Sequence, residues 1–178
     1  MKRFLFVLLS ILIFSCSLHK KEYVLTYTGL PYQDSTLNIP KHILPGIIQC
    51  EYYDFGGEGV AYHDSDNKNS GSGELNKGIS YLDQFRVSEA VDISYTKFHD
   101  DIDNSPYSIV KPKKDQLYIG WTEPGEWIRY TVNVQESGMY QVGAMYTSNR
   151  GGSIRLFIDD TDSTNQINIP TTYDSMIH

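Results

Sequence analysis

The run from Leu117 to Val134, LYIGWTEPGEWIRYTVNV, decides the fold that this sequence predicts. Apolar and polar residues alternate on both sides of a short interruption at 122–125, a pattern typical of two β-strands joined by a turn. Within the interruption, Pro124 presets one backbone angle and Gly125 adopts angles that other residues avoid. The stretch therefore predicts a β-hairpin.

The two strands of this hairpin are expected to place their tryptophans on different faces. The first strand carries an apolar set that consists of Leu117, Ile119 and Trp121. The return strand carries a set that consists of Ile128, Tyr130, Val132 and Val134. Because side chains alternate between the faces of a strand, Trp121 is predicted to lie in the core and Trp127 to point away from it. An outward tryptophan is typical of a binding surface, although packing of Trp127 beneath a neighbouring loop would satisfy the same pattern.

The composition favours a neutral, hydroxyl-rich ligand over a charged one. The 178 residues, 40% hydrophobic and 13% aromatic, fit one soluble domain with attachments, and the formal net charge is -7. Without Lys2 and Arg3 of the expected leader, 13 basic and 22 acidic side chains remain, a net charge of -9. This balance argues against nucleic acid or an anionic membrane surface as the partner.

The N-terminus has the features of an export signal. A basic start at 1–3 precedes an almost unbroken apolar run at 4–14, which is shorter than the roughly 20 residues that span a bilayer. Ser15 before Cys16 resembles a bacterial lipoprotein processing site, so residues 1–15 are expected to be removed and Cys16 to be lipidated. Cleavage at another small residue would leave Cys16 an ordinary thiol. The sequence thus predicts secretion across the inner membrane and a lipid anchor in the bacterial outer membrane, on a face that it leaves open.

A tether is predicted between the anchor and the folded domain. Residues 16–45 show little periodicity and carry three prolines, at Pro31, Pro40 and Pro45. The domain is therefore expected to begin at Gly46 and to occupy residues 46–178. With Cys16 lipidated, Cys50 has no partner for an intrachain disulfide.

The first predicted strand of the domain, Ile47 to Tyr53, places Gln49 and Glu51 on one face and Cys50 on the core face. Amide and carboxylate oxygens two residues apart on a strand are suitable ligands for a hard cation such as calcium. The same pair also fits the solvated side of an edge strand. From spacing alone, the solvated edge is the favoured interpretation.

Two polar stretches resemble metal loops without meeting their requirements. Asp64 to Glu74 fails as a helix–loop–helix calcium loop, because Asn69 stands where glycine is needed and Leu75 where a bidentate glutamate is needed. The acids that follow His99 could also hold a metal, but a run of acids in a loop is usually hydrated. Neither Ser70 nor Ser72 lies in a Gly-x-Ser-x-Gly elbow.

Short strands without helices are predicted for the rest of the domain. After the Gly56–Gly59 turn, strand patterns recur at 91–95, 139–147, 153–158 and 167–169, and alternation predicts that the second of them buries Tyr140, Val142, Ala144 and Tyr146. Many short strands with turn signals at close spacing predict an all-β protein, an antiparallel β-sandwich.

Four ordered motifs resemble family 6 carbohydrate-binding modules. They read GIIQCEYYDFGGEGVAYHDSDNKNSGS, FRVSEAVDI, YIGWTEPGEWIRYTVNV and SGMYQVGAMYTSNRGGSIRLFID, and the resemblance covers Gly46 to Pro170. It implies a jelly-roll sandwich that holds a sugar between two aromatic rings, which match Tyr62 and Trp127. It also implies a structural calcium, with Gln49 and Glu51 at the matching positions, which strengthens the calcium interpretation of the first strand.

The sequence departs from the family pattern at two places. The connection from Gly73 to Phe85 is longer than usual, and the chain stops at His178, where such modules continue with further strands that supply a polar cleft residue and a calcium ligand. The expectation is therefore a jelly roll whose last strands are missing, as in a truncated gene product. Such a sandwich would expose unpaired strand edges.

The resemblance implies non-catalytic binding of a polysaccharide or oligosaccharide, with the role of targeting a glycan-degrading protein, such as a glycoside hydrolase, to its substrate. An enzyme is the first rival interpretation, because Glu123 and Glu126 flank the turn and paired carboxylates hydrolyse glycosides. Both lie on one tight hairpin without a third wall, so no catalysis is expected in this chain. The same motifs would also suit a fragment of a glycoside hydrolase whose catalytic domain is absent, or a structural surface lipoprotein.

Overall fold

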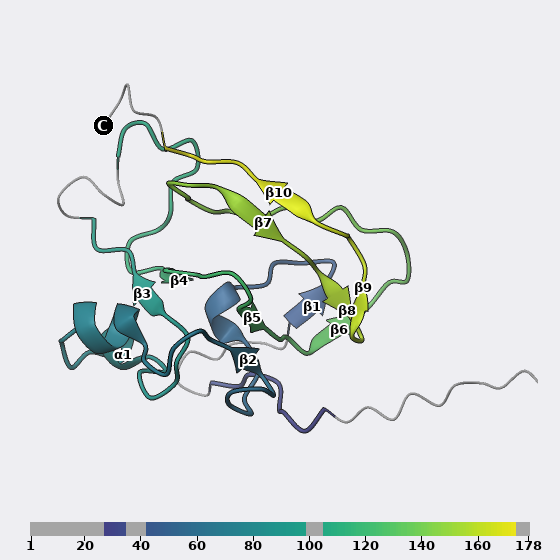
Figure 1. Ribbon diagram of the computed structural model, residues 1–178, viewed down its shortest axis with the longest axis horizontal. Coiled ribbons are helices and arrows are strands. Elements are labelled where there is room, and N and C mark those ends of the chain that lie inside the picture. The colour runs from purple at the N-terminus through teal and green to yellow at the C-terminus, as the bar shows by residue number, and fades with distance from the viewer. Residues whose placement is uncertain (1–26, 35–41, 99–104, 174–178) are drawn as a thin grey trace, which may run out of the picture.

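Short strands dominate the regular structure of this chain (Figure 1). The computed structural model describes residues 27–34, 42–98 and 105–173. The strands are β1 His42–Leu44, β2 Tyr62–His63, β3 Ile93–Tyr95, β4 Leu117–Ile119, β5 Trp127–Ile128, β6 Val132–Val134, β7 Gly152–Ile154, β8 Phe157–Ile158, β9 Thr161–Asp162 and β10 Ile167–Ile169. Three helical turns accompany them: the 3-10 helix η1 Cys50–Tyr52, the π-helix η2 Gly71–Leu75 and the α-helix α1 Tyr81–Gln84. The predicted all-β class is confirmed.

The strands around the 122–125 turn pair with distant partners rather than with each other. β4 runs antiparallel to β3, with Leu117 opposite Tyr95, and β5 runs antiparallel to β2. β6 pairs in parallel with β1. The predicted hairpin pairing was therefore wrong, although both strands and the turn are present and Gly125 has the expected positive φ of 101°. Within the described ranges each ladder joins two strands, so the continuous sheets of a jelly-roll sandwich stay a prediction.

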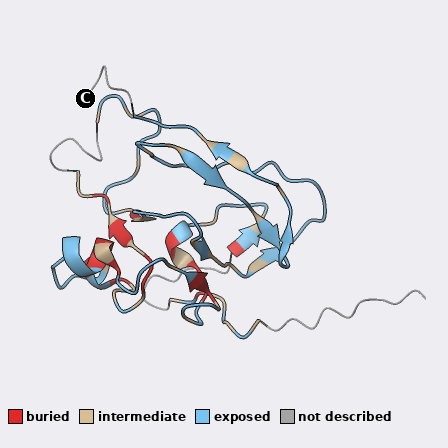
Figure 2. Ribbon diagram, viewed as in Figure 1, coloured by how far each residue is buried: buried red, intermediate tan, exposed pale blue. Residues whose placement is uncertain are grey.

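The hydrophobic core lies in the first two thirds of the chain. Its buried members are Tyr32, Tyr53, Ala61, Tyr62, Phe85, Ala90, Val91, Ile93 and Leu117. Figure 2 shows these buried positions gathered around β2, β3 and α1, whereas β7 to β10 are mostly exposed. Phe85 and its neighbours form a turn after α1. The core is rich in tyrosine, so many of its rings also present a hydroxyl that needs a hydrogen-bond partner.

The segment predicted as a tether contributes to the folded domain. The Tyr32 side chain is buried in the core, and its ring stacks on Phe55 with centroids 5.2 Å apart. Backbone hydrogen bonds join Leu30 to Phe55 in both directions, and β1 pairs with β6. The domain boundary at Gly46 was therefore wrong for residues 27–34 and 42–45. Apolar periodicity could not reveal these contacts, because they depend on single rings rather than on a repeated face.

The buried carboxylate of Asp54 connects the N-terminal segment, at Tyr27, to Thr131, which lies between β5 and β6. Its side chain accepts hydrogen bonds from the Tyr27 hydroxyl at 2.5 Å and from the Thr131 amide and hydroxyl at 2.9 and 2.7 Å. Burial, together with the hydrogen bond to Asp54, raises the pKa of Tyr27 to about 12, so this phenol stays a donor. Three donors on one buried carboxylate offset the cost of removing its charge from water.

Residues Ile47 to Tyr53 do not form the predicted first strand. Residues 50–52 form the 3-10 helix η1, in which the Tyr52 amide donates to the Gln49 carbonyl at 3.1 Å. A 3-10 helix turns about 120° per residue, so Gln49 and Glu51 no longer share a face as they would in a strand. Cys50, predicted as a core residue, is exposed.

Trp121 was predicted to lie in the core, and it is 48% exposed. β4 ends at Ile119, and Trp121 adopts a positive φ of 50°, which breaks the two-residue alternation on which the prediction rested. Its ring stacks against Tyr118, with centroids 6.2 Å apart. A positive φ is uncommon for a bulky residue. The alternation pattern assumes an extended backbone, so it did not predict this conformation.

The predicted strand at 139–147 is not formed, and its apolar side chains are exposed. Tyr140, Val142 and Tyr146, which alternation placed in the core, all face solvent. A strand buries its apolar face only when a second layer covers it, and residues 135–173 contribute nothing to the described core cluster.

Several predictions concern residues outside the described ranges. They are the export signal at 1–15, lipidation of Cys16, and the metal site considered at His99, Asp100, Asp101 and Asp103. Within the ranges that the structure does describe, no helix is long and apolar enough to cross a membrane.

Candidate functional site

The β2–β5 ladder separates a buried face from a solvent-facing one. Tyr62 lies opposite Ile128, and His63 lies opposite Trp127. Because directly paired residues of an antiparallel ladder project on the same side, the first pair faces the core and the second pair faces outward. Trp127 is 38% exposed, which confirms that it points away from the core.

Tyr62, the predicted partner ring for Trp127, lies on the opposite face. It is only 5% exposed, its ring meets Tyr53 edge-on at 5.6 Å, and its hydroxyl accepts a hydrogen bond from the Ala90 amide at 3.3 Å. Neighbouring residues of a strand point to opposite sides, so Tyr62 turns inward where His63 turns outward. The structure therefore does not bring Tyr62 and Trp127 together as two walls of one cleft.

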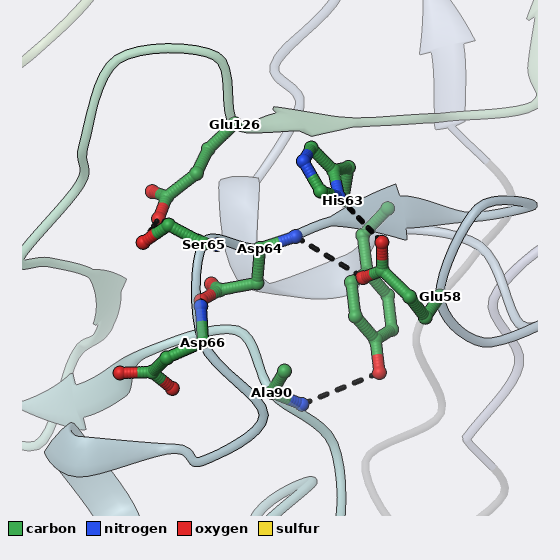
Figure 3. A network of polar contacts seen from close by, with 8 residues as sticks. Glu58, His63, Asp64, Ser65, Asp66, Ala90 and Glu126 are labelled. Atoms are coloured by element: carbon green, nitrogen blue, oxygen red, sulfur yellow. Dashed lines mark hydrogen bonds and ion pairs between the residues drawn. The ribbon is translucent and has the colours of Figure 1, made fainter.

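Polar side chains surround the outward face of β2 (Figure 3). His63 Nδ1 lies 2.5 Å from Glu58 Oε1, and the Asp64 amide donates to Glu58 Oε2 at 3.1 Å. The hydrogen bond to Glu58 raises the pKa of His63 above its usual value, because the carboxylate stabilises the protonated ring. These groups can both donate to and accept from the hydroxyls of a ligand.

Glu126, immediately before Trp127, holds the loop after β2 in place. Its carboxylate accepts from the Ser65 amide and hydroxyl at 3.1 and 2.7 Å, and from the Glu123 amide at 2.8 Å. Figure 3 shows Glu126 directed at Ser65, beside Asp64. Partial burial and the nearby acids raise the pKa of Asp64. Glu126 thus joins the two loops that border Trp127.

Arg129 supports the indole from the neighbouring position on the outward face. Its guanidinium carbon lies 5.7 Å from the Trp127 ring centroid and 4.8 Å from that of Tyr27. It also forms an ion pair with Asp160 at 2.9 Å. Nothing in the sequence indicated Tyr27 as the ring beyond it. A cation between two rings restrains both of them.

The two predicted calcium ligands lie in one pocket but differ in exposure. Gln49 is exposed and Glu51 is 4% exposed, and both line a pocket of about 650 Å³ beside β1 and β4. Burial raises the pKa of Glu51 to about 7. In the described part of the chain, no three His, Cys, Asp or Glu side chains gather closely enough to form a metal cluster.

The fold is all-β, and its solvent-facing Trp127 lies near side chains that can donate and accept hydrogen bonds. Residues 100–175 match the family model described as carbohydrate binding module (family 6). The predicted family resemblance is therefore confirmed over this range, which holds the last two of the four motifs and Trp127. The first two motifs, with Gln49, Glu51 and Tyr62, precede it. A search of curated proteins finds no match to this chain.

Proposed function

We propose that this chain binds a neutral polysaccharide or oligosaccharide, without transforming it, at the outward face of the β2–β5 ladder. The observation that carries the proposal is the open indole of Trp127, 38% exposed and directly opposite His63. The match to a carbohydrate-binding family supports the same class of ligand. We refer to Trp127, His63 and Glu58 as the ladder site.

The ladder site offers the two kinds of contact that a sugar ring needs. The C–H groups of a pyranose face are slightly positive and pack on the negative face of an indole, while Glu58 and His63 can bind its hydroxyls. One such ring contact contributes roughly 1.5 to 3 kcal/mol. After the cost of association, a single platform gives binding of roughly millimolar to micromolar strength. Tyr62 is buried, so its role in this proposal is to support the ladder rather than to contact sugar.

Weak binding of this kind is useful when the glycan is multivalent or insoluble. A domain that holds an attached or associated glycoside hydrolase near its substrate raises the local concentration of that enzyme. We therefore propose targeting of a glycan-degrading protein as the physiological role. Secretion and a lipid anchor at Cys16 are part of this proposal, and incorporation of labelled palmitate that is lost in Cys16→Ala would test the anchor.

Glycoside hydrolysis by Glu123 and Glu126 is the rival function. Glu126 already accepts three hydrogen bonds from loop residues, which suits a structural clamp better than a general acid that must exchange a proton with substrate. Release of reducing sugar by the purified protein, abolished in Glu126→Gln, would establish the enzyme instead.

Affinity electrophoresis through gels that contain single plant or algal polysaccharides tests the proposed function. We expect one glycan to retard the mature chain and Trp127→Ala to reduce the retardation. Trp121→Ala is the matched control, because that residue is also an exposed tryptophan beside the same turn but lies outside the ladder site. Equal retardation of the wild type and Trp127→Ala would overturn the ladder site, and the absence of retardation by every glycan would favour a structural lipoprotein.

We also propose that Glu51, with Gln49, holds a structural calcium ion. The fit rests on Glu51, a buried carboxyl whose pKa burial raises to about 7, because a nearby cation would offset the cost of its charge. Calcium takes oxygen ligands, which the Glu51 carboxylate and the Gln49 amide supply. Chelation should lower the melting temperature of the wild type but not that of Glu51→Gln.

A further inference from the structure

A second pocket opens away from the ladder site. It has a volume of about 260 Å³ and lies between residues 32–34, Phe55, Tyr81 and residues 84–86. None of these residues belongs to the network of Glu58, His63 and Glu126 around Trp127. We name it the α1 pocket, after the helix that forms one side of it. Its volume is slightly below the roughly 300 to 1,000 Å³ of typical ligand pockets, which suits a small ligand.

Two half-open rings, Phe55 and Tyr81, form the rim of the α1 pocket, each 37% exposed. Each is backed by a buried ring. Phe55 stacks on Tyr32 with centroids 5.2 Å apart and an interplanar angle of 25°, and Tyr81 meets Phe85 at 5.7 Å and 64°. The rim rings are therefore held in place before any ligand arrives, which lowers the entropy cost of binding.

Hydrogen bonds fix the tyrosines of the pocket further. The hydroxyls of Tyr32 and Tyr81 both donate to Asp34 Oδ2, the first at 3.0 Å. Burial raises the pKa of Tyr81, so its phenol remains protonated at neutral pH. These hydrogen bonds restrain the tyrosine side chains, so the aromatic faces stay directed at the pocket.

The pocket also offers amide groups for a ligand. Gln84 Nε2 donates to the Gly78 carbonyl at 2.8 Å, which leaves the side-chain carbonyl oxygen of Gln84 as an acceptor. The exposed side-chain amide of Gln33 makes no hydrogen bond within the ranges that the structure describes. Neutral donors and acceptors beside aromatic rings match the surface of a sugar, which has apolar C–H faces and hydroxyl edges.

The charges in the pocket exclude an anionic ligand. Arg86 is the one cation among the described residues that line the pocket. Its guanidinium pairs with Glu89 at 2.8 Å and donates to the carbonyls of Tyr53 and Asp54. The guanidinium carbon also lies 3.4 Å from the centroid of the Tyr53 ring. With its donors engaged, it has little capacity for a phosphate or a carboxylate, and Asp34 would repel one.

We propose that the α1 pocket is a second carbohydrate-binding site, which takes one neutral pyranose unit between Phe55 and Tyr81. This inference rests on the proposed function, because it assigns the same ligand class to a separate set of residues. Two weak sites on one chain allow simultaneous contact with two segments of a polysaccharide, which strengthens attachment more than either site alone.

NMR titration of the ¹⁵N-labelled mature chain can follow both sites at once. Cellohexaose, xylohexaose, laminarihexaose and agarohexaose serve as probes, the Trp127 indole N–H reports on the ladder site, and the side-chain amides of Gln33 and Gln84 report on the α1 pocket. We expect both sets of signals to shift. Trp127→Ala should leave the Gln33 and Gln84 shifts intact, whereas Tyr81→Ala should weaken the binding that they report at least tenfold.

Tyr81→Phe is the matched control, because it keeps the ring, and it should retain most of the binding at the α1 pocket. If the signals of Tyr81→Ala show an unfolded chain, Gln33→Ala replaces it, since that side chain is exposed. Shifts at Trp127 without shifts at Gln33 and Gln84 would overturn the α1 pocket and leave the ladder site standing. Unchanged spectra with every probe would overturn both.

Discussion

His63 lies directly opposite Trp127 in the antiparallel β2–β5 ladder, so their two side chains rise from the same solvent-facing side. The adjacent pair, Tyr62 and Ile128, faces the core. Substitutions on the solvent-facing side should therefore weaken binding, whereas substitutions on the core side should lower the stability of the fold.

Tyr62→Ala should unfold the domain more readily rather than weaken glycan binding selectively. Removal of a buried aromatic ring costs about 3 to 5 kcal/mol, whereas Tyr62→Phe, which loses only the hydrogen bond from the Ala90 amide, should cost about 1 kcal/mol. Trp127→Ala should change the free energy of unfolding by less than about 1 kcal/mol and abolish binding at the ladder site. Chemical denaturation of the three variants measures these differences, and a Tyr62→Ala protein of full stability would contradict the buried placement.

The N-terminal segment should contribute to stability through one ring. Tyr32 is buried in the core, whereas the Leu30 side chain, two residues earlier, is 66% exposed. We expect Tyr32→Ala to lower the free energy of unfolding by about 3 kcal/mol and Leu30→Ala to lower it by less than about 1 kcal/mol. Thermal and urea unfolding test this pair. Equal effects would mean that residues 27–34 behave as the tether that the sequence predicted.

Alternation predicted the outward direction of Trp127 and the strands at 93–95 and 117–119, because these depend on neighbours along the chain. It did not predict which strands pair. Leu117 meets Tyr95 and Ile128 meets Tyr62, and such distant pairs leave no trace in a local pattern. Pro124 and Gly125 correctly predicted a turn, but the turn does not join two strands that pair with each other.

The remaining differences between the predicted and the observed fold arise where the backbone conformation of one residue changes the side to which the following side chains point. The positive φ of Trp121 ends the alternation of β4, and the 3-10 turn at Cys50 separates the faces of Gln49 and Glu51. The α1 pocket was not foreseen, because Asp34, Phe55 and Tyr81 come from three segments without a shared motif. The frequent tyrosines of the sequence were the only signal of it.

The imidazole of His63 should titrate above the value of a free histidine. The hydrogen bond to Glu58 is the largest cause of the raised pKa, so Glu58→Gln should return the pKa toward its ordinary value of about 6.5. NMR titration of the histidine ring signals measures this directly. A His63 pKa that is unchanged by Glu58→Gln would show that the pair is not formed in solution.

Without calcium, Glu51 should make the protein less stable as the pH rises. The folded-state pKa is about 7 and the ordinary value is 4.5, so between these values the folded chain holds a proton that the unfolded chain has lost. The free energy of unfolding should therefore fall across this window, by up to about 3 kcal/mol, and the loss is complete above pH 7.

Urea denaturation from pH 4 to 8 in the presence of a chelator measures this slope, and Glu51→Gln should flatten it, because the amide does not titrate. Glu136→Gln is the matched control, since Glu136 is an exposed carboxylate. Added calcium should raise the stability of the wild type most at high pH, where the carboxyl is ionised and able to bind it. If added calcium leaves the pH dependence of the free energy of unfolding unchanged, Glu51 is a buried acid but not a calcium ligand.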